Sequence, residues 1–202
     1  MIRAIISDLG GVIVRVDKSK MARKLAEYSG LTPKEILGKF SSTTLTEFDK
    51  ELCLGMITPE EFFEKCANEF SLKGLSFEGF KEIYANIFEL IPATVELLEE
   101  QALSRKIILL SNTDAIHYDF YSQKFKEVFN IFAAQALSFR LHIAKPDRKI
   151  YLEAAKMAGL PPEDCLYIDD IKDYVNAAKE AGMKAVQFKS AEQLKEELAR
   201  LE

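Results

Sequence analysis

Six polar residues stand where apolar segments of the chain end or where a new segment begins, and their types suit one kind of chemistry. They are Asp8, Ser111, Asn112, Lys145, Asp169 and Asp170. Three carboxylates placed close together repel one another unless a cation lies among them. Oxygen ligands without His or Cys favour Mg²⁺, which readily shares its ligand shell with a phosphate. A lysine and a serine hydroxyl add donors for an anion, so the set predicts phosphoryl transfer with Asp8 as the attacking group.

Each of these residues also has a purely structural explanation. Asp8 could cap a turn, Ser111 could begin a helix, and Lys145 taken alone would be a solvated surface lysine. Asp170 could cap the helix predicted over "YVNAAKEAG", and for Asp173 the structural and functional explanations carry equal weight. Taken together, the structural explanations require that several independent segment ends carry groups suited to one site by accident. We therefore prefer the catalytic interpretation of the set.

Three neighbouring residues are interpreted as structural. Thr113 is expected to be the N-cap of the helix that begins near Asp114. His117 falls within that helix and His142 in a loop near Lys145. Neither histidine has the spacing of a metal ligand, so both are predicted to be non-catalytic.

Five short apolar segments predict the elements that hold the six residues. The first ends at Asp8, and the others cover 106–110, 132–137, 165–168 and 183–188. Continuous apolar runs without alternation are typical of parallel strands that are buried on both faces. Helical patterns such as "RKIYLEAAKMAG" lie between them. This order predicts an open α/β sheet, in which the carboxyl ends of parallel strands bring the polar residues to one edge.

Residues 16 to about 88 break this alternation. They are expected to form a second domain of about four helices without a convincing strand. Two helix starts are marked by Thr32-Pro33 and Thr58-Pro59, each with a glutamate two residues after the proline.

The predicted domain boundaries are 1–15 and 89–202 for the sheet-containing core and 16–88 for the helical insertion. An insertion that leaves the carboxyl end of a parallel strand projects over the edge where ligands bind. The insertion is therefore a candidate lid, with Phe40, Phe48 and Met56 as candidate lining residues.

The composition excludes several classes of protein. The 202-residue chain has a net charge of −5, which argues against a nucleic-acid-binding surface, and no apolar run approaches the length of a membrane span. The N-terminus lacks the pattern of a signal peptide. The three cysteines are widely spaced and form no Cys-x-x-Cys pair, which is typical of reduced thiols. We therefore expect a cytoplasmic monomer or weak homodimer whose partner is a small-molecule phosphate ester.

Four segments resemble the motifs of the haloacid dehalogenase superfamily. They are "IISDLGGVIV", "ILLSNTD", "AKPDRKIY" and "LYIDDIKDYVNAAKEAG", in the family's order. The resemblance implies a Rossmann-like α/β core with an inserted helical cap. The first motif is similar to that of phosphatases reading Asp-Leu-Gly-Gly or Asp-Leu-Gly-Asn. This group includes bacterial sugar-phosphate phosphatases and is related to the N-terminal phosphatase domain of soluble epoxide hydrolase.

The resemblance implies a role for each motif residue. Asp8 would be the nucleophile that forms an aspartyl-phosphate, Ser111 and Asn112 would bind the phosphate, and Lys145 would orient Asp8 and neutralise the phosphoryl oxygens. The expected function is therefore Mg²⁺-dependent hydrolysis of a small phosphorylated metabolite such as a sugar phosphate.

The resemblance also implies a metal site and a missing acid. Asp8 and Asp170 would bind Mg²⁺ with the backbone carbonyl of Gly10, and Asp169 would support them. Most phosphatases of the superfamily carry a second aspartate at the position of Gly10, as general acid and base. Bare backbone at Gly10 and Gly11 would let metal and phosphate come close. Because the metal, lysine and nucleophile positions are kept, we expect an active enzyme that is selective for its leaving group.

Three alternative functions are weighed against these residues. A haloacid dehalogenase shares the aspartate nucleophile but needs no metal, which the Asp169-Asp170 pair argues against. A phospho-receiver domain carries its acidic pair after the first strand, so the order of residues here is wrong for it. A non-catalytic descendant that binds a phosphorylated ligand or a partner protein is suggested by Gly10.

Overall fold

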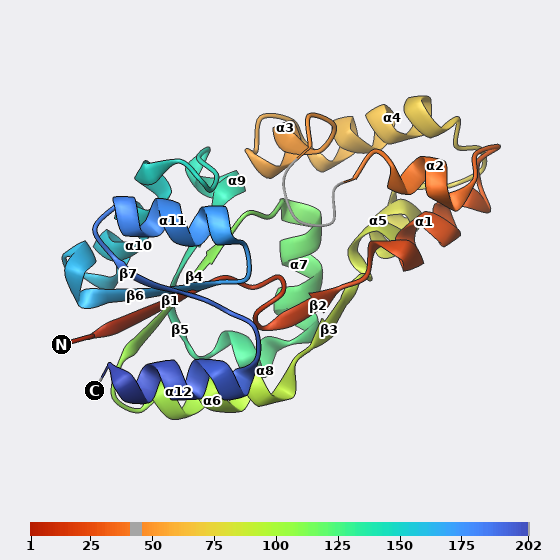
Figure 1. Cartoon of the computed structure of the whole chain (residues 1–202). Coiled ribbons are helices and arrows are strands. Elements are labelled where there is room, and N and C mark those ends of the chain that lie inside the picture. Colours follow the sequence, from red (N-terminus) through yellow and green to blue (C-terminus); the bar gives the residue numbers. More distant parts are fainter. Residues whose placement is uncertain (41–45, 202) are drawn as a thin grey trace.

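The computed structural model describes residues 1–40 and 46–201 and contains a five-stranded sheet at its centre (Figure 1). The strand order is β5-β4-β1-β6-β7, and every neighbouring pair is parallel. The strands are β1 (Ala4–Ser7), β4 (Lys106–Ser111), β5 (Phe132–Leu137), β6 (Cys165–Asp169) and β7 (Lys184–Gln187). This confirms the predicted α/β fold. Apart from the exposed first residue of β4, the three inner strands are buried, whereas the edge strands β5 and β7 are partly exposed.

Helices cover both faces of the sheet. Helices α10 (Arg148–Ala158) and α11 (Lys172–Glu180) lie on one face, and α6 (Pro92–Ala102) and α12 (Ala191–Arg200) lie on the other (Figure 1). Because successive side chains of a strand point to opposite faces, β1 contributes to two cores. Ile6 belongs to the core beneath α10 and α11, and Ile5 to the core beneath α6 and α12.

The helices that follow β4 and β6 show that one predicted cap is wrong and exclude one structural alternative. Asp114, not Thr113, is the N-cap of α7 (Ala115–Lys124), because its carboxylate accepts the backbone N–H of His117. Ile171 is the N-cap of α11, so neither Asp170 nor Asp173 caps that helix. The remaining core elements are α8 (Lys126–Phe129), α9 (Ser138–Leu141) and the 3₁₀ turn Pro162–Asp164.

The insertion forms a helical cap beside the core. The described residues contain five helices here rather than about four: α1 (Lys18–Ala26), α2 (Pro33–Leu37), α3 (Lys50–Cys53), α4 (Pro59–Phe70) and α5 (Phe77–Ala85). The predicted helix starts at Thr32 and Thr58 are confirmed, and both form complete capping boxes with Glu35 and Glu61. Aromatic side chains fill the interior of the cap, with Phe62 and Phe80 fully buried.

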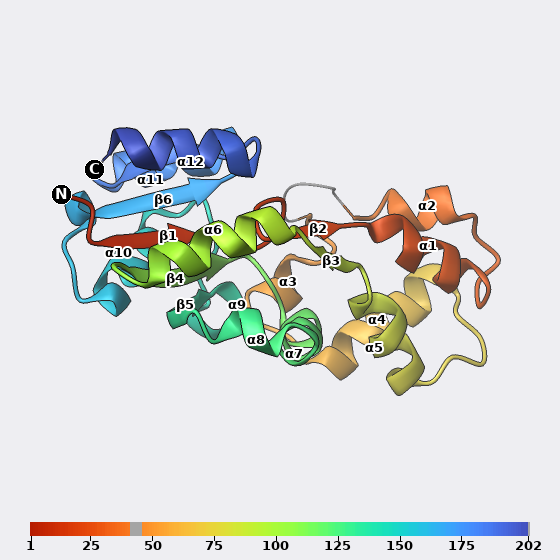
Figure 2. The same ribbon diagram turned by 90° about the horizontal axis from the view of Figure 1, so that it is seen from below.

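A two-stranded antiparallel sheet joins the cap to the core, where the sequence predicted no strand. Strand β2 (Val14–Val16) pairs with β3 (Phe88–Leu90) so that Val14 lies opposite Leu90. Figure 2 shows the pair between the core and the cap helices. The predicted boundaries at 16 and 88 therefore fall within these strands. Segments of three residues are too short for periodicity to reveal them.

No helix in the described residues has the length and apolar character that a bilayer crossing requires.

Candidate active site

The predicted site residues meet at the carboxyl ends of β1, β4 and β6, beneath the cap. A cavity of about 290 Å³ separates core and cap there. All but one of the predicted residues line it, namely Asp8, Gly10, Ser111, Asn112, Lys145 and Asp170. The exception is Asp169, which is fully buried behind them. The structure thus brings together side chains that are up to 162 positions apart in the chain.

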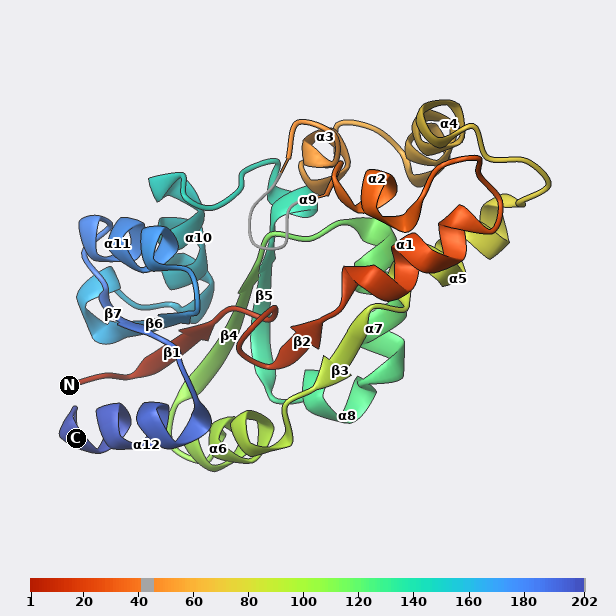
Figure 3. The same ribbon diagram turned by 45° about the vertical axis from the view of Figure 1, so that its right-hand side comes forward.

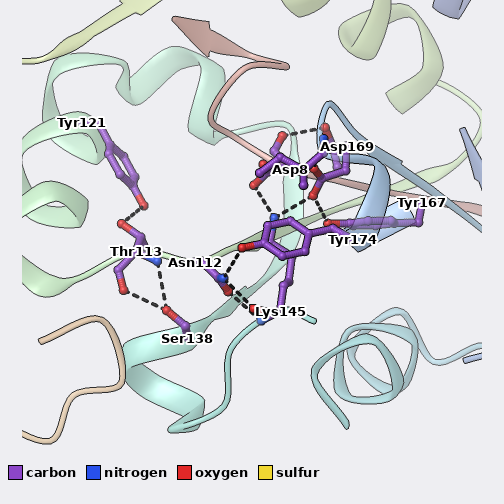
Figure 4. Close-up of polar contacts among 11 residues, drawn as sticks. Asp8, Asn112, Thr113, Tyr121, Ser138, Lys145, Tyr167, Asp169 and Tyr174 are labelled. Carbon is purple, nitrogen blue, oxygen red and sulfur yellow. Dashed lines mark hydrogen bonds and ion pairs between the residues drawn. The ribbon is translucent and has the colours of Figure 1, made fainter. Parts of the chain in front are cut away.

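A buried lysine links two of the carboxylates. The Lys145 Nζ lies 2.9 Å from Asp8 Oδ1 and 2.8 Å from Asp169 Oδ2 (Figure 4). Asp169 Oδ2 also accepts the hydroxyl of Tyr167, and its Oδ1 accepts the backbone N–H of Ile171 at 2.8 Å. Both oxygens of Asp169 are therefore engaged in holding Lys145 and the start of α11.

Burial and charge set the protonation of these groups. Burial raises the pKa of Asp8 to about 7, an effect that the Lys145 ammonium opposes and the Asp169 carboxylate adds to. The pKa of Asp170 is also raised, chiefly by burial and to a smaller extent by the negative charge of Asp169. Burial alone would lower the pKa of Lys145, but the two neighbouring carboxylates outweigh it and raise that pKa, so the lysine stays protonated.

The cluster suits a divalent cation. Asp8, Asp169 and Asp170 each offer an oxygen, and these oxygens lie within 4.8 Å of one another. Three carboxylates face one ammonium group, so the fully ionised cluster carries an excess of two negative charges. Hard oxygen donors and this charge fit Mg²⁺. Because the oxygens of Asp169 already accept hydrogen bonds, the geometry favours Asp8 and Asp170 as the side chains that would hold the ion.

The two glycines that follow Asp8 and Leu9 differ in what they require. Gly11 has a positive φ of 75°, and a Cβ there would lie 2.3 Å from Asp170 Oδ2. Only glycine lets the backbone approach this carboxylate. At Gly10 a Cβ would lie 3.5 Å from Val16 Cγ2, an ordinary contact, and φ is not in the left-handed region. Packing within the protein therefore requires glycine at Gly11 and not at Gly10, and the close approach of metal and phosphate to both glycines stays a prediction.

Asn112 holds the backbone of Lys145. Its Oδ1 accepts the Lys145 N–H at 2.8 Å, and its Nδ2 donates to the Lys145 carbonyl at 3.0 Å. This contact was not evident in the sequence, where the two residues are 33 positions apart. Ser111 lines the cavity at the end of β4. The phosphate-binding roles of Ser111 and Asn112 stay predictions.

Two tyrosines that the sequence analysis missed surround Lys145. The Lys145 Nζ lies 4.9 Å from the ring centroid of Tyr174 and 5.9 Å from that of Tyr167 (Figure 4). Tyr167 precedes Asp169 by two positions on β6, which places both side chains on the same face of the strand. That alternation was the available signal.

The cap residues that line the cavity differ from those expected. In the described part of the chain they include Val16, Lys18, Asp49, Cys53 and Tyr84. Phe40, Phe48 and Met56 are not among them, which corrects the prediction. Phe40 and Phe48 pack edge to face in the aromatic interior of the cap, and Met56 is exposed to solvent.

Both histidines make structural contacts. His117 is buried between Asp114, whose Oδ2 lies 2.5 Å from its Nδ1, and the carbonyl of Tyr84, 3.1 Å from its Nε2. His142 donates from Nδ1 to the carbonyl of Leu54 at 2.8 Å. Each histidine thus joins the core to the cap.

Comparisons with known proteins find a matching family model and several relatives in sequence. A family model described as haloacid dehalogenase-like hydrolase matches residues 2–182. The chain is 30% identical to flavin mononucleotide hydrolase 1 of Arabidopsis thaliana, over 86% of this chain and 68% of that protein. It is 24% identical to D-ribitol-5-phosphate phosphatase of Bacteroides thetaiotaomicron, over 98% and 97%.

A solved structure shares the whole fold. The crystal structure of a haloacid dehalogenase family enzyme from Bacteroides thetaiotaomicron, a point mutant in complex with magnesium and inorganic phosphate, matches with a TM-score of 0.84. The identity is 24%, and the match covers 94% of this chain and 95% of that one. At this identity the similarity establishes the fold.

Proposed function

Because the chain belongs to the haloacid dehalogenase-like hydrolases, we propose that it is a Mg²⁺-dependent phosphatase of a small phosphorylated metabolite. The observation that carries the proposal is the buried cluster in which Lys145 contacts Asp8 and Asp169 while Asp170 stands opposite Gly11. It combines a nucleophile, a fixed cation and a carboxylate pair suited to a metal. Two relatives, one named a flavin mononucleotide hydrolase and one a D-ribitol-5-phosphate phosphatase, support this reaction class.

The chemistry proceeds in two displacements at phosphorus. The Asp8 carboxylate attacks the phosphorus, the bond from phosphorus to the ester oxygen breaks, and that oxygen leaves with the organic group as an alkoxide or phenolate that takes its proton from solvent. Water then attacks the phosphorus of the aspartyl-phosphate, which releases inorganic phosphate and restores the carboxylate.

The chain's own residues organise these steps. Lys145 holds Asp8 in place, favours its ionised form and neutralises phosphoryl oxygens. Ser111 offers a hydroxyl donor at the end of β4, and the loop at 111–113, which lines the cavity, would bind the phosphate. Asp8 and Asp170, with the backbone carbonyl of Gly10, would hold Mg²⁺, and the ion would supply further positive charge beside the phosphoryl group.

A sugar phosphate is the substrate class that we favour. The cavity of about 290 Å³ has room for a small metabolite, and the cap contributes both a cation, Lys18, and an anion, Asp49. Walls with both charges suit hydroxyl groups, which donate and accept. A relative named for D-ribitol-5-phosphate supports this class and the related sugar-phosphate phosphatase subgroup.

The decisive experiment is phosphate release from p-nitrophenyl phosphate with EDTA, with Mg²⁺ restored, and with the Asp8→Asn variant as control. We expect release that needs both Mg²⁺ and Asp8. A panel of sugar, sugar-alcohol and flavin phosphates then ranks substrates by kcat/KM. Metal-independent release of chloride from a 2-chloro acid would establish the dehalogenase alternative. Tight phosphate binding without any turnover would establish the non-catalytic one.

A further inference from the structure

A second contact between cap and core lies outside the catalytic cluster. The end of α3 rests on α9, as the views in Figures 1 and 3 both show. The hydroxyl of Ser138 lies 2.7 Å from the carbonyl of Cys53, and Nδ1 of His142 lies 2.8 Å from the carbonyl of Leu54. Two consecutive carbonyls of the cap are thus bound by side chains of the core.

Gly55 extends this contact by backbone alone. It has a φ of 63°, and a Cβ there would lie 2.2 Å from the carbonyl oxygen of Phe139. No real Cβ approaches an oxygen so closely, so any other residue would force the two segments apart. We call residues 53–55 with residues 138–142 the docking contact.

Ser138 also touches the active-site loop. Its Oγ accepts the backbone N–H of Thr113 at 2.9 Å and lies 2.9 Å from the carbonyl of the same residue (Figure 4). Thr113 follows Ser111 and Asn112 and lines the same cavity. A serine hydroxyl has a single proton, so it donates to the Cys53 carbonyl or to the Thr113 carbonyl but not to both at once.

We propose that Ser138 is a positioning residue that couples docking of the cap to the conformation of the loop at 111–113. With the cap docked, the hydroxyl proton goes to Cys53; with the cap apart, it goes to Thr113. The coupling deepens the proposed function and rests on it, because the loop is assigned there to phosphate binding. By linkage, a ligand on the loop must then favour docking as much as docking favours the ligand.

The three cysteines provide a readout that needs no turnover. Cys53 lies at the docking contact, Cys66 inside the cap and Cys165 in β6, and all three are buried free thiols. Alkylation with N-ethylmaleimide, followed by mass spectrometry of each cysteine peptide, measures undocking at Cys53, unfolding of the cap at Cys66 and unfolding of the core at Cys165.

Two glycine variants test the docking contact. Gly55→Ala should accelerate modification of Cys53 at least tenfold and leave Cys66 and Cys165 unchanged. Gly74→Ala is the matched control, because Gly74 also has a positive φ, 73°, but a Cβ there meets no atom within 4 Å. An unchanged Cys53 rate in Gly55→Ala, or equal acceleration at Cys53 and Cys66, would overturn the assignment.

Ligand protection tests the coupling. Inorganic phosphate with Mg²⁺ should slow modification of Cys53 in the wild-type protein and lose this effect in Ser138→Ala. Tyr121→Phe is the control, because the Tyr121 hydroxyl also bonds to Thr113, at Oγ1 and 3.2 Å, without contacting Cys53. It should keep the protection.

The outcomes separate this inference from the proposed function. Protection that persists in Ser138→Ala would be simple shielding by the ligand and would overturn the coupling, as would its absence in the wild type. In an active enzyme, Ser138→Ala should lower kcat for p-nitrophenyl phosphate several-fold more than Tyr121→Phe does. A protein that shows the predicted Cys53 rates but hydrolyses no phosphate ester would retain the docking contact and refute the phosphatase.

Discussion

Replacing Gly10 with aspartate should give the enzyme a proton donor that its own sequence lacks at this position. Phosphate-monoester hydrolysis can require acceleration of up to ~10²¹-fold, or about 28 kcal/mol. One general acid supplies roughly 10² to 10⁴ of this, about 3 to 5 kcal/mol. The wild-type protein should therefore hydrolyse esters of acidic alcohols well and esters of simple alkyl alcohols poorly, because the latter depart as unstable alkoxides.

The structure admits the substitution. A Cβ at Gly10 meets only Val16 Cγ2, at 3.5 Å, whereas Gly11 could not be changed without displacing Asp170. The burial that raises the pKa of Asp8, and the negative charge of the cluster, would also favour the protonated form of a new carboxyl group beside it. A protonated carboxyl group is the form that a general acid needs.

The assay is kcat/KM for a series of aryl and alkyl phosphates, plotted against the pKa of the leaving alcohol. Wild type should give a steep negative slope, and good leaving groups should give a burst of alcohol equal to the enzyme concentration. Gly10→Asp should flatten the slope, with a gain of at most about 10² to 10⁴ for the poorest leaving groups. Gly10→Asn introduces a side chain of the same size that has no acidic proton, so it should keep the wild-type slope.

Two results would refute this reasoning. A flat wild-type slope with chemistry shown to be rate-limiting would mean that another group already protonates the leaving oxygen. Equal slopes for Gly10→Asp and Gly10→Asn, in proteins with matched melting temperatures, would mean that the position does not face the leaving group.

Further substitutions test the rest of the cluster. Asp8→Asn should abolish turnover with a near-unchanged circular dichroism spectrum, and more than trace activity would contradict a covalent intermediate. Asp170→Asn should raise the Mg²⁺ concentration for half-maximal rate by on the order of tenfold or more, because a charged ligand is lost. Asp17→Asn, at the N-cap of α1, is the control and should not change it. Lys145→Met should destabilise the fold by roughly 3 to 5 kcal/mol in urea titrations at neutral pH, because two buried carboxylates lose their cation. In EDTA, the folded state keeps a proton on Asp8 between its ordinary pKa of 3.8 and about 7, so stability falls as pH rises through that window. Asp8→Asn should escape this loss, and its advantage over wild type should grow by up to about 4 kcal/mol between pH 4 and pH 8, unless the native carboxyl group titrates normally.

The sequence predicted those parts of the molecule that local chemistry determines. Continuous apolar runs predicted the parallel strands, because a strand that is buried on both faces has no side chains that face solvent. The threonine-proline pairs located two cap helices, because an N-cap bond involves residues only three positions apart. The polar residues at the strand ends could be assembled from topology alone, since parallel strands share one edge.

Contacts between distant segments could not be predicted in this way. The amide of Asn112 binds the backbone of Lys145, and nothing in either local sequence indicates that pairing. The cap wall depends on how five helices pack, so Phe40 and Phe48 turned inward while Lys18 and Asp49 face the cavity. Thr113 and Asp114 are both good N-caps by type, and only the backbone decides which carries the bond.

The pairing of β2 with β3 also makes the cap a removable module. Val14 and Leu90 lie opposite each other in an antiparallel ladder, so their Cα atoms are separated by roughly 5 Å. The entire insertion is thus a loop closed at its base, and a hairpin turn of a few residues could replace it while the core strands kept their register. The same base could accept a foreign cap of different shape. A grafted cap that kept the docking contact with Ser138 could then change selectivity for the alcohol portion of the substrate while the phosphate-binding loop kept its conformation.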